Sequence, residues 1–257
     1  MIRFAKKSPR EIDVAISEQN GVRSLHLGGS EIQSAMRINA PNELELLYTQ
    51  YMMGFLLFQP APSHILMIGL GGGSLAKFVY HQIPQTKTTV VEINQQVISA
   101  AFNHFALPEA DERLQIILAD GEQYLRDYSP TIDILMVDGF HDDCQSASLC
   151  SQEFYNQAYQ VLNKNGMLVV NLLSQNKNLN TYLQRIKDSF QGRVVTILSG
   201  ACGNLIVFAF KHSLGRLSWK ILKARAKKLE EMYDLPFSDC VSRLRESTYS
   251  HHNYIEI

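Results

Sequence analysis

The sequence has few cysteines, little net charge and no long hydrophobic run. Its four cysteines are scattered and form no CxxC pair, which argues against a disulfide framework or a zinc site and indicates a reducing compartment. The net charge of −1 favours neither nucleic acid nor an anionic membrane as a partner. No apolar stretch approaches the length of a membrane span, and residues 1–8 lack the apolar core of a secretion signal. We therefore expect a cytoplasmic protein that binds neither membranes nor nucleic acid.

The composition is that of a globular protein. Of the 257 residues, 46% are hydrophobic and 19% are charged, which is enough apolar sequence for a sizeable core. This length fits one large domain, alone or with a small appendage.

The first 60 residues differ in pattern from the rest. Residues 10–35 contain short alternating runs, 12–16 and 23–27, separated by the turn signal Asn20-Gly21. Helical spacing of apolar residues then extends to Phe58, with Asn42 as the expected N-cap. Because prolines follow, at 60 and 62, we predict a small N-terminal β region with a linking helix (1–60) and a second domain (61–257).

Strands and helices alternate after this boundary. The expected strands are 64–68, 88–92, 114–118, 132–137, 166–171, 193–198 and 205–210, and the expected helices between them are 74–81, 95–105, 122–127, 151–162 and 178–190. Several strands are almost wholly apolar, as in a parallel sheet covered by helices on both faces. The last two strands have no helix between them, so we expect an antiparallel pair at one edge. The sequence predicts an α/β fold with a mostly parallel, seven-stranded sheet. The lysine-rich segment 219–231 is predicted to be an amphipathic helix packed on this domain.

Residues that can bind a nucleoside follow four of the strands. A glycine run begins at Gly69 after the first strand, and Glu92, Asp120 and Asp138 end or follow the next three. Ligands of open α/β sheets bind beyond the carboxyl ends of the strands. Glycines allow close approach of a ligand, and a carboxylate at the second strand can accept hydrogen bonds from ribose hydroxyls.

The spacing also indicates which nucleoside. A dinucleotide fingerprint requires a third glycine where Ser74 stands. Asp120-Gly121 is placed to meet an adenine amino group. The order of glycines, Glu92 and Asp120 therefore favours a ligand of the S-adenosylmethionine (AdoMet) type over a dinucleotide.

Seven segments, in this order, resemble the spermidine synthase (polyamine aminopropyltransferase) family, in particular its short bacterial branch. They are Gln33-Ser-Ala-Met36, Tyr48-Thr-Gln-Tyr-Met-Met53, Gly69-Leu-Gly-Gly-Gly-Ser74, Val91-Glu-Ile93, Asp120-Gly121, Asp133-Ile-Leu-Met-Val-Asp-Gly139 and Glu153-Phe-Tyr155. The resemblance implies an AdoMet-methyltransferase-like Rossmann domain behind a small β-rich region. It also implies transfer of an aminopropyl group from decarboxylated AdoMet to a small amine such as putrescine, without a metal, by a homodimer.

The resemblance implies specific roles for the matching residues. Gln33 and Glu92 would hold the ribose region, and Asp120 the adenine. Asp138 would accept the proton of the amine, and Tyr48 would orient that amine. The remaining expected cofactor-binding residues are Gly69, Gly71, Gly72, Gly73, Ser74 and Gly121.

The chain departs from the family pattern at three positions, each of which usually carries a carboxylate. Ser74 replaces an aspartate that binds the aminopropyl amine. His141 replaces the second aspartate of the loop after Asp138, although Asp142 follows directly and is the candidate to substitute for it. Gln50 replaces a glutamate near Tyr48. His141 is a further candidate because an imidazole titrates near neutral pH.

Two other functions remain open. A methyltransferase or other alkyl transferase using intact AdoMet is compatible with Ser74, because a serine does not repel the carboxylate of that ligand. A protein that binds the nucleoside without turnover is compatible with the missing carboxylates.

Overall fold

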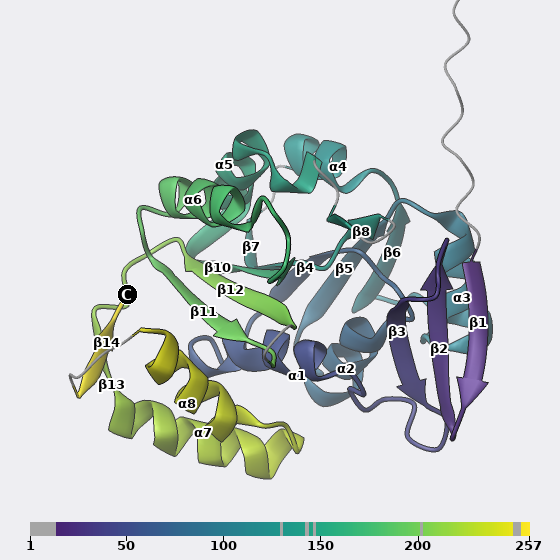
Figure 1. The fold of residues 1–257 in the computed structure, drawn as a ribbon, viewed down its shortest axis with the longest axis horizontal. Helices are drawn as coiled ribbons and strands as arrows, with labels where there is room; N and C mark the ends of the chain where they lie inside the picture. Colours follow the sequence, from purple (N-terminus) through teal and green to yellow (C-terminus); the bar gives the residue numbers. More distant parts are fainter. Residues whose placement is uncertain (1–13, 129–130, 142–143, 146–147, 201–202, 249–252) are drawn as a thin grey trace, which may run out of the picture.

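A seven-stranded sheet with the order β11-β12-β10-β7-β4-β5-β6 forms the centre of the computed structural model (Figure 1). The structure describes residues 14–128, 131–141, 144–145, 148–200, 203–248 and 253–257. The strands are β4 (His64–Ile68), β5 (Lys87–Glu92), β6 (Leu114–Leu118), β7 (Ile132–Val137), β10 (Leu162–Leu173), β11 (Val194–Leu198) and β12 (Asn204–Phe210). The strands from β10 to β6 pair in parallel, whereas β12 is antiparallel to both of its neighbours. The predicted sheet and its antiparallel edge are confirmed.

Helices cover both faces of this sheet. On one face lie α2 (Ser74–Gln82), α3 (Gln95–His104), α7 (Trp219–Tyr233) and α8 (Phe237–Ser247), and on the other α4 (Gly121–Asp127), α5 (Gln152–Val161) and α6 (Leu179–Ser189) (Figure 1). Successive residues of a strand pack into the cores on opposite faces of the sheet. In β4, Ile65 and Met67 pack on the first face, and Leu66 and Ile68 pack on the second. Because both faces are buried, the strands are apolar at most positions.

Several helices start at a polar N-cap residue. The Asn94 side chain accepts from the amide of Gln96, and the Ser151 side chain accepts from that of Phe154. Each cap satisfies an amide that has no partner within its helix. The helix predicted at 151–162 ends at Val161, because β10 begins directly at Leu162.

The linking helix is present, but its predicted start after Asn42 is wrong. Residues 41–46 are not helical, and the helical segment is α1 (Leu47–Met52) followed by the 3₁₀ helix η1 (Met53–Leu57). The side chain of Gln50 donates to the carbonyl of Leu44 at 2.6 Å, a bond that a helical amide would otherwise make. The apolar spacing in this segment reflects burial against the sheet, since Tyr51, Phe55 and Leu57 belong to its core.

A separate antiparallel sheet lies at the N-terminus, as expected. It consists of β1 (Val14–Gln19), β2 (Val22–Leu27) and β3 (Ile32–Arg37). Asn20 and Gly21 both have positive φ, 52° and 77°, as a two-residue hairpin turn requires. The strand β3 was not predicted, nor were the short pairs β8 (Phe140–His141) with β9 (Cys144–Gln145) and β13 (Arg216–Ser218) with β14 (Tyr254–Glu256). The domain boundary at residue 60 stays a prediction. No helix in the described ranges has the length and apolarity to cross a membrane.

Lys77 ties the N-terminal region to the larger sheet. Its side chain is 1% exposed, and its ammonium donates to the carbonyls of Pro41 (2.7 Å) and Phe105 (2.6 Å). Burial lowers the pKa of Lys77 from 10.5 to about 8. The folded protein therefore binds fewer protons than the unfolded chain between these two values.

A consequence of this pKa is a pH-dependent stability. The free energy of unfolding of the wild type, relative to Lys77→Met, should rise as the pH increases from about 8 toward 10, because the unfolded state holds the extra proton there. Chemical denaturation at several pH values measures this difference. Lys187→Met, at an exposed position of α6, is the control and should show no such trend. Parallel pH curves for wild type and Lys77→Met would contradict the expectation.

Candidate active site

A cavity of about 690 Å³ lies beyond the carboxyl ends of β4 to β7 and β10, and the loop into β3 forms part of its wall. In the sheet, β5 and β6 lie on one side of β4 and β7 lies on the other, so the strand order reverses beside β4. Ligands bind at this switch point in open α/β sheets. The volume is within the range of small-molecule sites. Its polar lining residues are Glu31, Gln33, Ser34, Tyr48, Thr49, Ser74, Glu92, Asn94, Asp120, Asp138, Ser148, Asn171 and Asn204.

The glycine loop after β4 brings the backbone against Asp138. Gly69 has φ +97°, and a Cβ there would lie well inside van der Waals contact with the carbonyl oxygen of Asp138. Gly69 and Gly71 line the cavity. Gly72 and Gly73 do not line it and instead pack against Phe105 and Leu107. Their expected contribution is thus restricted to the shape of the loop.

Glu92 closes the loop from the next strand. One of its carboxylate oxygens accepts from the amide of Leu70 and the other from that of Asn94, both at 2.9 Å. Burial raises the pKa of Glu92, and the two backbone hydrogen bonds oppose this rise. The fixed carboxylate lines the cavity, where it can accept hydrogen bonds from ribose hydroxyls.

Asp120 caps a helix and also lines the cavity. Its Oδ1 accepts from the amides of Glu122 (2.8 Å) and Gln123 (3.1 Å), so it is the N-cap of α4. Its Oδ2 makes no hydrogen bond with the part of the chain that the structure describes. Gly121 lines the cavity beside it, and Ile93, 65% exposed, presents an apolar side chain to the same space. A carboxylate oxygen beside an apolar surface suits the amino edge and the flat face of an adenine.

Gln33 of β3 and Ser74, the first residue of α2, line the cavity where these two elements meet. The Ser74 hydroxyl is buried and lies 3.4 Å from both the hydroxyl of Ser34 and the carbonyl oxygen of Ala35. Gln33 is half-buried and lines the cavity. The structure therefore brings both predicted residues to the site, although Ser74 makes its contacts with the N-terminal sheet.

Asp138 is held between two polar side chains. Its Oδ2 accepts from the hydroxyl of Tyr48 at 3.1 Å, and its Oδ1 accepts from Nδ2 of Asn171 at 2.8 Å. Burial raises the pKa of Asp138, while these two hydrogen bonds lower it. The pKa of Tyr48 is raised well above its usual value, first by burial and then by Asp138, so Tyr48 stays a donor at neutral pH. The carboxylate is oriented, and it is a stronger base than an exposed aspartate.

Two further candidates cannot be placed. Asp142 lies outside the described residues, and only the backbone of His141, in β8, is described.

Sequence reasoning missed Asn171 and Glu31. Asn171 is the single polar residue in the apolar run at 167–173, at the strand end that faces the cavity. This break in an otherwise buried strand was the signal that could have identified it. Glu31 lies in the loop before β3, a strand that was itself not predicted.

The described lining of the cavity is negatively charged. It contains the carboxyl groups of Glu31, Glu92, Asp120 and Asp138, whereas none of its described residues is a lysine, an arginine or a histidine. Such a site attracts a cationic ligand and disfavours an anionic one. Within the described ranges, no group of three or more metal-ligating side chains was found.

Comparison with known proteins relates the chain to one family. Residues 45–212 match the family described as the spermine/spermidine synthase domain. A polyamine aminopropyltransferase of Chromobacterium violaceum is 38% identical over 235 residues, which cover 91% of this chain and 90% of that protein. A probable spermidine synthase from Corynebacterium glutamicum has the same fold, with a TM-score of 0.75 at 18% identity over 91% of this chain and 90% of that one. Human methyltransferase-like protein 13, solved in complex with SAH, has a TM-score of 0.67 at 25% identity, covering 74% of this chain and 94% of that one.

Proposed function

Because the chain belongs to the spermine/spermidine synthase family, and is thus a transferase of polyamine biosynthesis that moves aminopropyl groups, we propose that its donor is decarboxylated AdoMet and its acceptor a small diamine such as putrescine. In this proposal Asp138 is the catalytic base. Glu92 and Gln33 hold the ribose, and Asp120 holds the adenine.

The charge of the cavity is the observation that carries the choice of donor. Decarboxylated AdoMet is a cation at its sulfonium and at its amine, and a diamine acceptor brings two further amines that are protonated at neutral pH. Four carboxyl groups line the described wall without a cationic side chain to offset them. Intact AdoMet would bring a further carboxylate, and an unpaired charge is costly to desolvate.

Asp138 is suited to prepare the amine. An amine is protonated at neutral pH and cannot attack until it loses a proton. The oriented carboxylate of Asp138 can bind the ammonium and accept that proton. The nitrogen lone pair then forms a bond to the aminopropyl carbon beside sulfur, and the carbon–sulfur bond breaks with its electrons remaining on sulfur. The products are the extended amine and neutral methylthioadenosine, and alignment of the two reactants supplies much of the rate.

Binding calorimetry with both donors tests the proposal. Decarboxylated AdoMet should bind at least about tenfold more tightly than intact AdoMet, a difference of ~1.4 kcal/mol. Tighter binding of intact AdoMet would contradict it. Methylthioadenosine serves as the control ligand, since it lacks both the aminopropyl chain and the carboxylate.

Methyl transfer from intact AdoMet is a second candidate activity of the same site, and Ser74 is the observation that favours it. The usual aspartate at this position would repel the carboxylate of intact AdoMet, whereas the buried hydroxyl of Ser74 does not. The calorimetric comparison separates the two candidates.

A further inference from the structure

Helix α1 carries Tyr48 but cannot fix its own position. It has only six residues, and its N-cap, Leu46, provides no side-chain hydrogen bond. Isolated helices this short are not stable in water. The orientation of Tyr48 toward Asp138 must therefore depend on the contacts that α1 makes with other elements.

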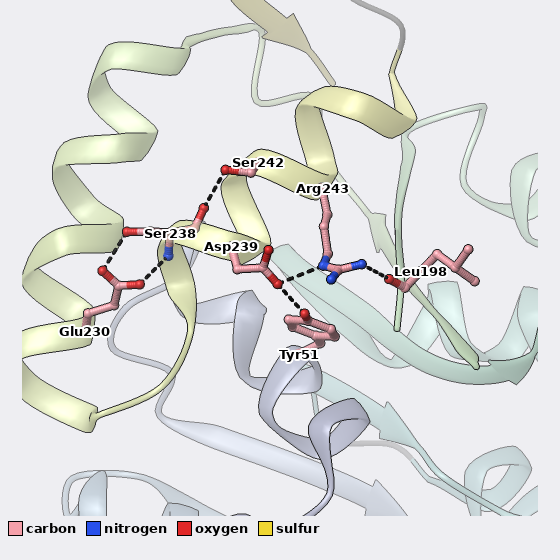
Figure 2. A network of polar contacts seen from close by, with 7 residues as sticks. All are labelled: Tyr51, Leu198, Glu230, Ser238, Asp239, Ser242 and Arg243. Atoms are coloured by element: carbon pink, nitrogen blue, oxygen red, sulfur yellow. Dashed lines mark hydrogen bonds and ion pairs between the residues drawn. The ribbon is translucent and has the colours of Figure 1, made fainter. Parts of the chain in front are cut away.

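One turn after Tyr48, Tyr51 connects α1 to α8. Its side chain is 1% exposed, and its hydroxyl donates to Oδ2 of Asp239 (Figure 2). The same oxygen accepts from Nε of Arg243 at 2.7 Å, and the guanidinium lies 5.3 Å from the centre of the Tyr51 ring. Arg243 in turn donates from Nη1 to the carbonyl of Leu198, at the end of β11, at 2.9 Å. These contacts join α1, α8 and the edge strand.

At neutral pH, Tyr51 is protonated and Asp239 is ionised, which favours the hydrogen bonds between α1 and α8. Burial, followed by the hydrogen bond to Asp239, raises the pKa of Tyr51 to about 12, so the hydroxyl keeps its proton. Burial would raise the pKa of Asp239, but the hydrogen bonds from Tyr51 and Arg243 outweigh it and lower the pKa below its usual value. A charged acceptor thus receives two donors, which makes both hydrogen bonds stronger than neutral ones.

We propose that Asp239, with Arg243, is a positioning residue that acts through Tyr51 to hold Tyr48 against Asp138. This inference rests on the proposed role of Asp138 as the base. It assigns a role in the reaction to the C-terminal helix, which contributes no described residue to the wall of the cavity.

The expected consequence of loosening α1 is a change in the pKa of Asp138. Its described polar neighbours are Tyr48 from α1 and Asn171 from β10, with Glu31, Glu92 and Asp120 elsewhere on the cavity wall. Because the hydrogen bond from Tyr48 lowers the pKa of Asp138, loosening α1 should raise that pKa further.

The test compares Tyr51→Phe, which removes one hydroxyl and keeps the buried ring, with Asp239→Asn and Tyr48→Phe. Ser238→Ala is the matched control. It removes the Ser238 hydroxyl contact to Glu230 of α7, 2.5 Å long, within the same helical pair, and Figure 2 shows Ser238 directed toward Glu230 and away from Tyr51. In each variant the Asp138 carboxyl is titrated by NMR with ¹³C-labelled aspartate, its signal being identified by its absence in Asp138→Asn. Methylthioadenosine release across pH is measured in parallel.

Tyr51→Phe and Asp239→Asn should move the Asp138 titration in the same direction as Tyr48→Phe and lower kcat about tenfold with little change in donor KM. Ser238→Ala should leave both unchanged. A titration at the wild-type position in Tyr51→Phe would overturn the proposal, even if the melting temperature falls. The NMR titration needs no turnover. If the wild type releases no methylthioadenosine but the Asp138 titration still shifts in Tyr51→Phe, the proposed function is refuted and the positioning of Tyr48 by Tyr51 stands. Should Asp239→Asn not fold, Tyr51→Phe alone decides.

Discussion

Asp138→Asn should lower kcat for methylthioadenosine release by about 10²–10⁴-fold, the range typical of a lost general base. Asparagine keeps the size of the side chain and can still accept one hydrogen bond, from Tyr48 or Asn171, but it cannot accept a proton from the amine. The Kd for methylthioadenosine, measured by calorimetry, should change little because Glu92 and Asp120 remain.

The pH dependence of kcat/KM in the wild type provides a second test of Asp138 as the base. Burial raises the pKa of Asp138, and only the ionised carboxylate accepts a proton. The value of kcat/KM should therefore fall as the pH decreases through that raised pKa, and this acid limb should be absent in Asp138→Asn. Asp127→Asn, at an exposed position of α4, is the control and should behave as the wild type. Turnover of Asp138→Asn at the wild-type rate would exclude Asp138 as the base.

Gly69→Ala should abolish binding of methylthioadenosine and lower the free energy of unfolding by about 2–5 kcal/mol. Gly69 has φ +97°, which a Cβ disfavours, and the added carbon would overlap the backbone carbonyl of Asp138. Since that obstacle is backbone, the glycine loop and the segment after β7 must move apart, and both form the cavity wall. Calorimetry and urea denaturation measure the two effects.

The matched control for this variant is Gly192→Ala. Gly192 also has a positive φ, +75°, but a Cβ there would meet nothing within 4 Å. Gly192→Ala should lower the free energy of unfolding by about 1 kcal/mol, from backbone strain alone, and leave methylthioadenosine binding unchanged. If Gly69→Ala binds methylthioadenosine as tightly as Gly192→Ala does, the close approach of Gly69 to Asp138 has no functional importance.

Features that depend on local patterns were predictable from the sequence. Apolar runs at 64–68 and 132–137 specify buried strands, and polar residues at their ends specify where a ligand binds. Glu92, Asp120 and Asp138 reach one cavity because parallel strands end at the same edge of the sheet. The antiparallel strand pair at the other edge followed from the short turn between its members.

Features that depend on long-range contacts were not predictable in this way. Asp138 and Asn171 are 33 positions apart, and Tyr51 and Asp239 are 188 apart. Nothing in the local sequence states which buried polar side chain will meet which. The predicted helix start at Asn42 was wrong for a related reason. Its apolar spacing arises from packing against the large sheet, and burial alone does not distinguish a helix from a series of turns.

Product analysis tests the central claim most directly. The protein is incubated with decarboxylated or intact AdoMet and with putrescine, cadaverine, spermidine or diaminopropane, and the products are identified by mass spectrometry. We expect methylthioadenosine and an amine extended by one aminopropyl group, formed from decarboxylated AdoMet alone. Methyl transfer from intact AdoMet, or methylthioadenosine binding without turnover of any amine, would contradict the assignment.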